Sequence, residues 1–204
     1  MRPILILFAG PNGAGKSTLF GRLLGKSSIP WVDPDGLARN RFGIEAEAHA
    51  REAFEIAEAE RKRLLATGED FGFETVFSDP FGYKIGFLKE AQRAEYRISV
   101  HYIGLASADL SILRVRQRVG VGGHSVPEEK ILSRYHRSLR NLATVLAWVD
   151  EVTIYDNSSP DHPYRLIAQI QRGTLLARVA IFPEWTRPLD LERLPQATPP
   201  TLLP

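Results

Sequence analysis

The sequence predicts an α/β fold in which helices flank a five-stranded parallel sheet, with a small C-terminal appendage. Residues 3–9 are apolar without interruption, which indicates a strand buried on both faces, as in parallel sheets. A glycine-rich turn and then a helical pattern follow that strand. Strand and helix patterns alternate as far as residue 156, which is typical of a parallel sheet with helical crossovers.

The strands are expected from their apolar patterns and from the residues that end them. The second strand is short because Pro34 breaks it. In the third, Phe71 and Phe73 alternate with Gly72 and Glu74. The five expected strands are residues 3–9, 29–33, 70–77, 96–105 and 150–156.

Helices are expected between these strands. The longest carries an alanine-rich stripe at steps of three and four residues and stops at Gly68. The last begins at Pro127, with Glu128 and Glu129 in its first turn. The expected helices are residues 16–25, 45–67, 80–94, 107–119 and 127–148.

The C-terminal part departs from this alternation. Residues 164–182 fit either a β-hairpin or a helix followed by a strand. From Pro183 the chain is rich in proline and leucine, and we expect it to lie extended against the body or to be disordered. We therefore expect one domain over residues 1–182 and a tail over residues 183–204.

Composition limits the function classes. The chain has 204 residues, 44% hydrophobic and 25% charged, which fits a globular domain with a sizeable core. It has no cysteine, which excludes disulfides, cysteine-bound metals and a thiol nucleophile and fits a cytoplasmic location. The net charge is only +2, so a basic site needs local clustering. The N-terminal apolar run is too short to cross a membrane, and no membrane partner is expected.

The turn after the first strand has the pattern G-x-x-x-x-G-K-[ST] at residues 10–17. Its glycines let backbone N–H groups point at phosphate oxygens, and the helix that follows adds a positive N-terminal end. Lys16 should bridge β- and γ-phosphates, and Ser17 should coordinate Mg²⁺. The pattern predicts a nucleoside triphosphate site made by Gly10, Pro11, Asn12, Gly13, Ala14, Gly15, Lys16, Ser17 and Thr18.

Motifs of other phosphate-loop proteins are missing from the sequence. There is no N-K-x-D guanine motif and no L-S-G-G-Q motif. The fourth strand ends at Leu105 without the acid that hydrolytic ATPases place there. Acids occur instead at the second and third strands, as Asp33, Asp35 and Glu74. Because the carboxyl ends of parallel strands share one edge, these acids are expected beside the phosphate loop.

That placement favours a small-molecule kinase. Phosphoryl transfer to a hydroxyl needs a carboxylate that aligns the hydroxyl and accepts its proton, and Asp35 is the better candidate because it lies just beyond the strand. Asp33 and Asp35 could alternatively serve as turn and helix-cap residues. Glu74, among apolar residues, could form a buried ion pair or bind substrate hydroxyls.

A basic stretch at residues 114–140 is the expected lid. It holds seven lysines and arginines against two acids, and a glycine segment at 120–124 interrupts it. Arginines there could neutralise the transferring phosphate, although a solvated charged face gives the same pattern. Nucleic-acid binding is disfavoured by the modest net charge and the lack of interleaved aromatic residues. His124 could contact phosphate or cap the loop.

Several segments spread over residues 3–182 together resemble the zeta toxin family of kinases, in particular its ABC-type-ATPase-like branch. The matching segments are residues 10–18, 32–35, 73–78, 118–119, 122–127, 134–142 and 155–158. The resemblance implies a nucleotide-kinase-like sheet, ATP with Mg²⁺, and a reaction like that of zeta toxins, which phosphorylate the 3′-hydroxyl of UDP-N-acetylglucosamine. It also implies a possible antitoxin protein as partner.

The resemblance assigns roles to individual positions. Asp35 matches the catalytic base, Glu74 a sugar-nucleotide-binding acid, and Asn157 the place where adenine is held. The catalytic candidates are Asp35, Lys16, Arg118 and Arg134. The substrate-binding candidates are Asp35, Arg39, Glu74, Thr75, His124 and Arg137, and Ser17 is the metal candidate.

Two functions stay open at this point. The first is an ATP-dependent kinase acting on a small-molecule hydroxyl, with a nucleotide sugar as the expected acceptor. The second is an ATP-binding switch that hydrolyses slowly and acts through a protein or nucleic-acid partner. A closed acceptor pocket beside the γ-phosphate favours the kinase.

Overall fold

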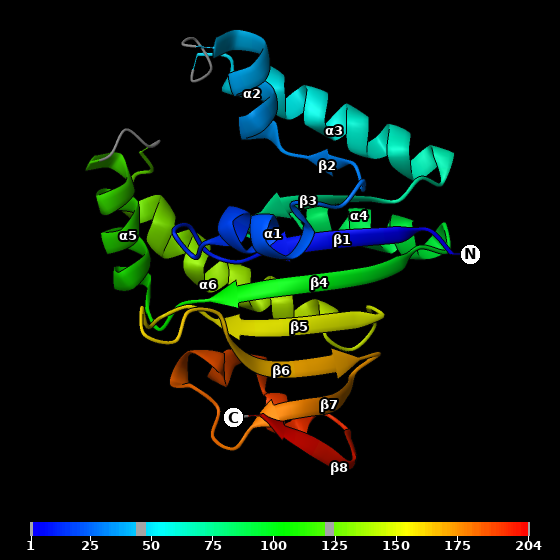
Figure 1. Cartoon of the computed structure of the whole chain (residues 1–204), viewed down its shortest axis with the longest axis vertical. Helices are drawn as coiled ribbons and strands as arrows, with labels where there is room; N and C mark the ends of the chain where they lie inside the picture. Colours follow the sequence, from blue (N-terminus) through cyan, green and yellow to red (C-terminus); the bar gives the residue numbers. More distant parts are fainter. Residues whose placement is uncertain (1, 44–47, 121–124, 204) are drawn as a thin grey trace.

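A computed structural model describes residues 2–43, 48–120 and 125–203, apart from the side chains of Asp35, Arg39, Ala50 and Pro199. One twisted sheet runs through the molecule, and its described strands follow the order β2-β3-β1-β4-β5-β6-β7-β8 (Figure 1). The strands are β1 (Ile4–Ala9), β2 (Trp31–Val32), β3 (Phe71–Thr75), β4 (Arg97–Gly104), β5 (Glu151–Asp156), β6 (Arg165–Gln171), β7 (Thr174–Val179) and β8 (Gln196–Leu203).

The five predicted strands form the parallel part of this sheet. β1 lies between β3 and β4, with Phe8 opposite both Glu74 and His101. β2 and β5 pair in parallel at the two sides of this group. The parallel α/β core is therefore confirmed, but the sheet is larger than the five strands predicted, because β6 and β7 continue it in antiparallel fashion and β8 pairs parallel to β7.

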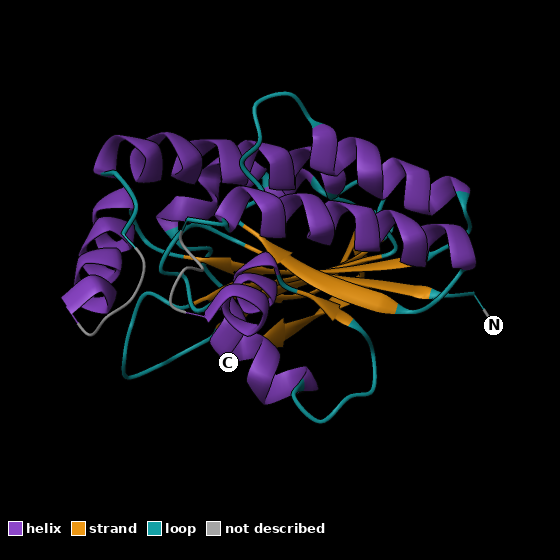
Figure 2. Cartoon of the chain, turned by 90° about the horizontal axis from the view of Figure 1, so that it is seen from above, coloured by secondary structure: helices purple, strands orange, loops and turns teal. Residues whose placement is uncertain are grey.

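Helices lie on both sides of the sheet when it is seen from above (Figure 2). The described α-helices are α1 (Lys16–Leu24), α2 (Pro34–Phe42), α3 (Ala50–Thr67), α4 (Tyr83–Arg93), α5 (Ala108–Gly120) and α6 (Glu128–Val145). On one face, Phe71 and Phe73 of β3 meet Phe87 of α4 edge-on. On the other face, Phe8 meets Phe20 of α1, with ring centroids 5.9 Å apart.

The core follows from the uninterrupted apolar run of β1. Leu5, Leu7, Phe8 and Ala9 have no exposed surface, since both faces of this central strand are covered. Burying a large apolar side chain contributes about 1.5–3 kcal/mol each, so this strand anchors the sheet.

Helix α2 was not predicted. The proline that suggested a break occupies the first position of the helix, where its missing N–H costs nothing. The preceding residue, Asp33, accepts the backbone N–H of Gly36 at 2.9 Å and so caps the helix. Asp33 therefore serves as a helix-cap residue, which was one of the two roles considered for it.

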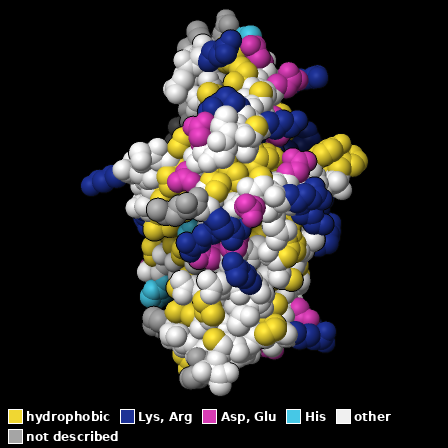
Figure 3. All heavy atoms as spheres, turned by 90° about the vertical axis from the view of Figure 1, so that its right-hand side faces the viewer, with side chains coloured by type: hydrophobic (Ala, Val, Ile, Leu, Met, Phe, Trp, Pro, Cys, Tyr) yellow, Lys and Arg dark blue, Asp and Glu magenta, His cyan; other side chains and the backbone are white. Residues whose placement is uncertain are grey.

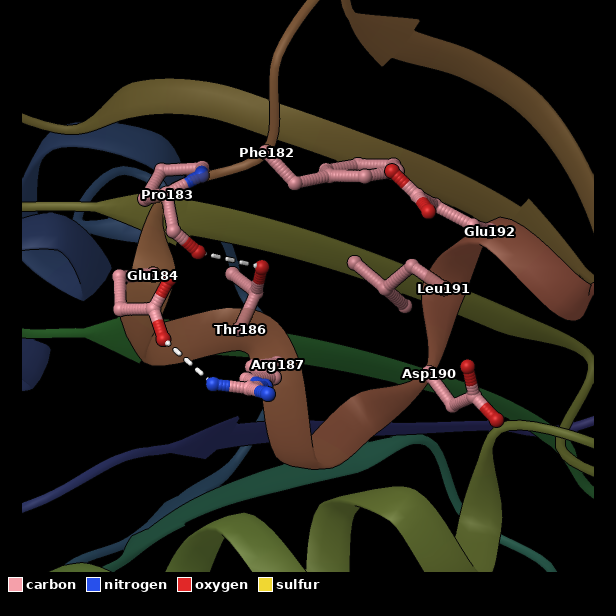
Figure 4. Close-up of a pocket in the computed structure, with 8 residues that line it drawn as sticks. All are labelled: Phe182, Pro183, Glu184, Thr186, Arg187, Asp190, Leu191 and Glu192. Carbon is pink, nitrogen blue, oxygen red and sulfur yellow. Dashed lines mark hydrogen bonds and ion pairs between the residues drawn. The ribbon is translucent and has the colours of Figure 1, made fainter.

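For residues 164–182 the sequence allowed either a β-hairpin or a helix followed by a strand. The structure contains the hairpin, formed by β6 and β7. Its turn, Arg172–Gly173, has φ angles of 46° and 77°, as a tight hairpin requires. The tail also has structure of its own, with short 3₁₀ helices at Glu184–Leu189 and Leu191–Arg193 before β8. Residues between Phe182 and Glu192 line a pocket of about 280 Å³ (Figure 4).

The tail is fastened to the sheet by Trp185. The indole ring is buried and lies so close to Gly104 of β4 that a Cβ there would stand 2.1 Å from it. Leu189 and Leu191 are buried as well. Of the two alternatives for the tail, the extended one is confirmed for residues 196–203, which pair with β7 as β8, whereas residues 184–189 and 191–193 form 3₁₀ helices.

Candidate active site

The phosphate loop joins β1 to α1 at the edge of the sheet where the parallel strands end (Figure 1). Gly10 passes so close to β4 that a Cβ would lie 2.2 Å from the carbonyl oxygen of Ile103. Gly13 and Gly15 have φ angles of 74° and 89°, which strain any residue with a side chain. The glycines of the motif are therefore explained by backbone geometry.

Lys16 lies over this loop. Its Nζ donates to the carbonyl oxygens of Gly10 and Pro11, both at 3.1 Å, and the residue is 9% exposed. The ammonium group is thus held beside the backbone that would surround a phosphate.

Three side chains hold the outside of the loop. Ser111 of α5 donates its hydroxyl to the carbonyl of Asn12. Asn157, just after β5, donates Nδ2 to the carbonyl of Ala14 at 2.9 Å. Tyr164, just before β6, donates its hydroxyl to the carbonyl of Gly15 at 3.0 Å. Sequence reasoning missed Ser111 and Tyr164, because nothing in the sequence brings residues some hundred positions away to this loop.

Asn157 was expected to hold adenine, and here it contacts the loop. Its Oδ1 also accepts the backbone N–H of Tyr164 at 3.3 Å, and the residue is 8% exposed. Both ends of the amide are thus engaged within the protein. The adenine contact stays a prediction.

Glu74 and Ser17 form the second part of the site. Ser17 Oγ donates to Glu74 Oε2 at 2.7 Å. The contact arises because β3 neighbours β1, so the end of β3 lies beside the start of α1. A serine hydroxyl and a carboxylate are both oxygen ligands of the kind that Mg²⁺ takes. The sequence predicted these residues separately, as a metal ligand and a substrate ligand, and did not predict their contact.

Asp35 and Arg39 are both carried by α2. The backbone of Asp35 is in the first turn of this helix, directly after Asp33 and Pro34. The side chains of Asp35 and Arg39 lie outside the described structure, so their proposed contacts with substrate stay predictions.

The turn after β3 is held by helix α6. Arg137 Nε donates to the carbonyl of Ser78 at 2.9 Å, and Asn141 Nδ2 donates to the carbonyls of Phe77 and Asp79 at 3.0 and 3.2 Å. The hydroxyl of Thr75 accepts the N–H of Phe77, a fully buried residue with φ of 58°. Arg137 and Thr75, both expected to bind substrate, thus support the turn that follows the Glu74 strand.

The basic stretch at 114–140 corresponds to α5 and α6. An ion pair between Arg116 and Glu128 links the two helices. Arg118 is exposed on α5, and Arg134 is half-buried on α6. Residues 121–124, which include Gly122, Gly123 and His124, lie outside the described residues, and Gly120 ends α5, so the lid stays a prediction.

A sequence model of the family described as zeta toxin matches residues 1–165. The chain belongs to the zeta toxin family. This match includes the phosphate loop, the Glu74 strand and Tyr164, so family membership rests on the part of the chain that builds the site.

A Haemophilus influenzae protein described as uncharacterized is 27% identical over 135 residues, which cover 64% of this zeta-family chain and 91% of that protein. Two solved structures share the fold at lower identity. One, from the PezAT toxin–antitoxin system of Streptococcus pneumoniae, has a TM-score of 0.58 and 18% identity, covering 82% of this chain and 72% of that one. The other, AvrRxo1-ORF1:-ORF2 with ATP, has a TM-score of 0.64 and 15% identity, and the match covers 84% of this chain and 59% of that one.

Family and fold together support a P-loop kinase. In the described part of the chain, no helix is both long enough and apolar enough to cross a membrane.

Proposed function

We propose that this zeta toxin family protein is an ATP-dependent kinase that transfers the γ-phosphate to a hydroxyl group of a small molecule. The acceptor class that we propose is a nucleotide sugar such as UDP-N-acetylglucosamine. We also propose that the protein acts in the cytoplasm. The observation that carries the proposal is the hydrogen bond between Ser17, in the phosphate loop, and Glu74. It joins the phosphate loop to an acid at the end of the neighbouring strand β3.

The donor half of the reaction uses the loop and its lysine. ATP would bind along Gly10–Thr18, with phosphate oxygens accepting backbone N–H groups and Lys16 facing the β- and γ-phosphates. Mg²⁺, held by Ser17 and the phosphates, would neutralise charge on the transferring group. Glu74 is placed to accept hydrogen bonds from the hydroxyl of Ser17 or from water around the ion.

The acceptor half uses helix α2. Its first turn carries Asp35 at the sheet edge that also carries the phosphate loop. We propose that Asp35 aligns the acceptor hydroxyl and takes its proton as the oxygen attacks the γ-phosphorus, while the bond to the β-phosphate oxygen breaks. Arg118 and Arg134 are the proposed partners of the developing phosphate charge.

The first experiment incubates the full chain with Mg-ATP and a panel of nucleotide sugars and detects products heavier by one phosphate. Asp35→Ala should lower transfer by at least about a hundredfold, because a general base typically contributes that much or more. ATP affinity should stay within a few-fold of wild type. Glu192→Ala, an exposed acid of the tail, is the control and should transfer normally. If Asp35→Ala lost both ATP binding and phosphate transfer, the result would contradict the role given to Asp35.

A protein partner is a second proposal. The fold is shared with a protein of the PezAT toxin–antitoxin system and with a member of the AvrRxo1-ORF1:-ORF2 complex. An antitoxin-like protein is therefore the partner class proposed. On the face seen in Figure 3, nucleic acid is a weaker candidate, since basic and acidic side chains are interspersed there and ion pairs such as Arg97–Glu151 and Arg172–Asp150 join β-strand ends.

A further inference from the structure

We propose that Tyr164, together with Asn157 and Ser111, is a positioning group that fixes the phosphate loop in its phosphate-binding conformation. We call these three residues the outer clamp. The inference rests on the proposed nucleotide site and adds to it the residues that determine how tightly the loop holds phosphate.

The outer clamp acts on the carbonyl groups of the loop. In a trans peptide, the C=O of one residue and the N–H of the next lie in one plane and point in opposite directions. The carbonyl of Gly15 accepts the hydroxyl of Tyr164 and also the backbone N–H of Leu19, both at 3.0 Å, so the N–H of Lys16 points away from these two donors. Asn157 and Ser111 act in the same way on the peptides that carry the N–H groups of Gly15 and Gly13.

Each of these peptides therefore presents its N–H group on the side away from the clamp residue that holds its carbonyl. A phosphate-binding loop needs several N–H groups that converge on one anion. Free peptides of a glycine-rich loop can rotate, because glycine allows many backbone conformations. Three side chains from α5 and from the segments after β5 and before β6 remove this freedom before the ligand arrives, and preorganised donors bind more tightly.

The fit around Gly15 shows how closely the outer clamp is built. A Cβ on Gly15 would lie 2.5 Å from the hydroxyl oxygen of Tyr164 and 2.9 Å from Nδ2 of Asn157. The clamp residues therefore require glycine at this position of the motif, in addition to its φ of 89°.

Tyr164 is itself held in an uncommon conformation. Its φ is 57°, in the left-handed region that residues with side chains rarely adopt. Asn157 accepts its N–H, and the guanidinium of Arg22 lies 5.1 Å from the centre of its ring. A strained backbone that persists because several contacts over-determine it is typical of functional sites.

The test compares two tyrosine variants by isothermal titration of the full chain with Mg-ATP and with Mg-tripolyphosphate. Tyr164→Phe removes only the hydroxyl that donates to the carbonyl of Gly15 and leaves the N–H of Leu19 donating to it. It should weaken the binding of both ligands by the same factor, about three- to tenfold, which corresponds to the loss of one hydrogen bond. Tyr155→Phe, the same change on β5, should bind both within about twofold of wild type. Its hydroxyl lies 3.3 Å from Nδ1 of His101.

A second variant, Ser111→Ala, removes another hydroxyl of the outer clamp and should weaken both ligands in the same direction. The equal effect on tripolyphosphate is the discriminating readout, since a residue that only contacts the nucleoside would leave tripolyphosphate unchanged.

The outer clamp is overturned if wild type binds both ligands, Lys16→Ala does not, and Tyr164→Phe and Ser111→Ala bind like wild type. It is also overturned if Tyr164→Phe weakens ATP alone. If wild type binds neither ligand, the proposed nucleotide site fails, and the clamp fails with it.

Discussion

At the scale of single residues, the site depends on contacts that bring acids and hydroxyls to the phosphate loop. The sequence identified Lys16, Ser17 and Glu74 as candidates from their motif and their strand positions. The pairing of Ser17 with Glu74 and the support from Tyr164 come from strand order and loop path, which local patterns do not encode.

Glu74→Gln tests the proposed role of this acid at the metal. The amide keeps the size of the side chain but removes its charge, so the Mg²⁺ concentration for half-maximal phosphotransfer should rise by about tenfold, as for other groups that orient metal ligands. ATP binding measured without Mg²⁺ should stay unchanged. Glu184→Gln, an exposed change in the tail, is the control. An unchanged Mg²⁺ dependence in Glu74→Gln would show that the acid serves another part of the reaction.

His101 gives a prediction about pH. Its ring stacks on the rings of Phe8 and Tyr155, with ring centroids 4.8 Å and 6.1 Å apart. Burial lowers the pKa of His101 below its usual 6.5. The folded protein therefore favours the neutral ring, so this contribution to the free energy of unfolding is present above pH 6.5 and decreases as the pH falls below it.

Urea unfolding at several pH values tests this. His101→Phe keeps the stacking and removes the titration, so wild type should lose stability relative to this variant as the pH falls from 7 toward 5. His136→Phe, at an exposed position, is the matched control and should follow wild type. Parallel pH profiles of wild type and His101→Phe would contradict the argument.

At the scale of elements, the parallel strands could be predicted from the sequence, whereas helix α2 and the turn after β3 could not. The apolar run of β1 leaves few alternatives, because a strand buried on both faces needs apolar side chains on both. In β4 the buried Ile98, Val100 and Tyr102 alternate with Ser99 and His101. Helix α2 carries little apolar periodicity and begins at a proline, so no pattern distinguished it from a turn. The turn after β3 could not be predicted either, since Arg137 and Asn141 hold it from about 60 residues away.

Asn141→Ala tests the support that α6 gives to this turn. It leaves the carbonyls of Phe77 and Asp79 without their donor, which should lower the free energy of unfolding by about 1–3 kcal/mol. The same variant should reduce kcat through the displaced Glu74 strand. Asn40→Ala, an exposed asparagine on α2, is the stability control in the same denaturation experiment. A stability equal to that of Asn40→Ala would mean that the turn holds its shape unaided.

At the scale of the whole molecule, the C-terminal segments complete the sheet. β6, β7 and β8 continue it beyond the predicted parallel strands, and the buried Trp185 joins the tail to β4. Sequence patterns indicated the hairpin and an extended tail as alternatives, but they did not predict the 3₁₀ helices or the burial of Trp185.

Trp185→Ala tests whether the tail is part of the stable fold. The change empties the space over Gly104 and should destabilise the protein by about 3–5 kcal/mol, as for other buried tryptophans. Ile181→Ala, where the side chain is 83% exposed, should change stability by less than about 0.5 kcal/mol. Thermal unfolding of both variants measures the difference. Equal melting temperatures would show that the tail contributes little to the fold.

The central claim is that the donor loop and the acids beside it transfer phosphate to an acceptor hydroxyl. The most direct measurement is the ratio of phosphorylated acceptor to ADP formed, with Mg-ATP and the best nucleotide sugar of the panel. The kinase proposed here predicts a ratio near one, which collapses in Asp35→Ala. ADP formation without phosphorylated acceptor across the whole panel would contradict it and favour a slow ATP-hydrolysing switch.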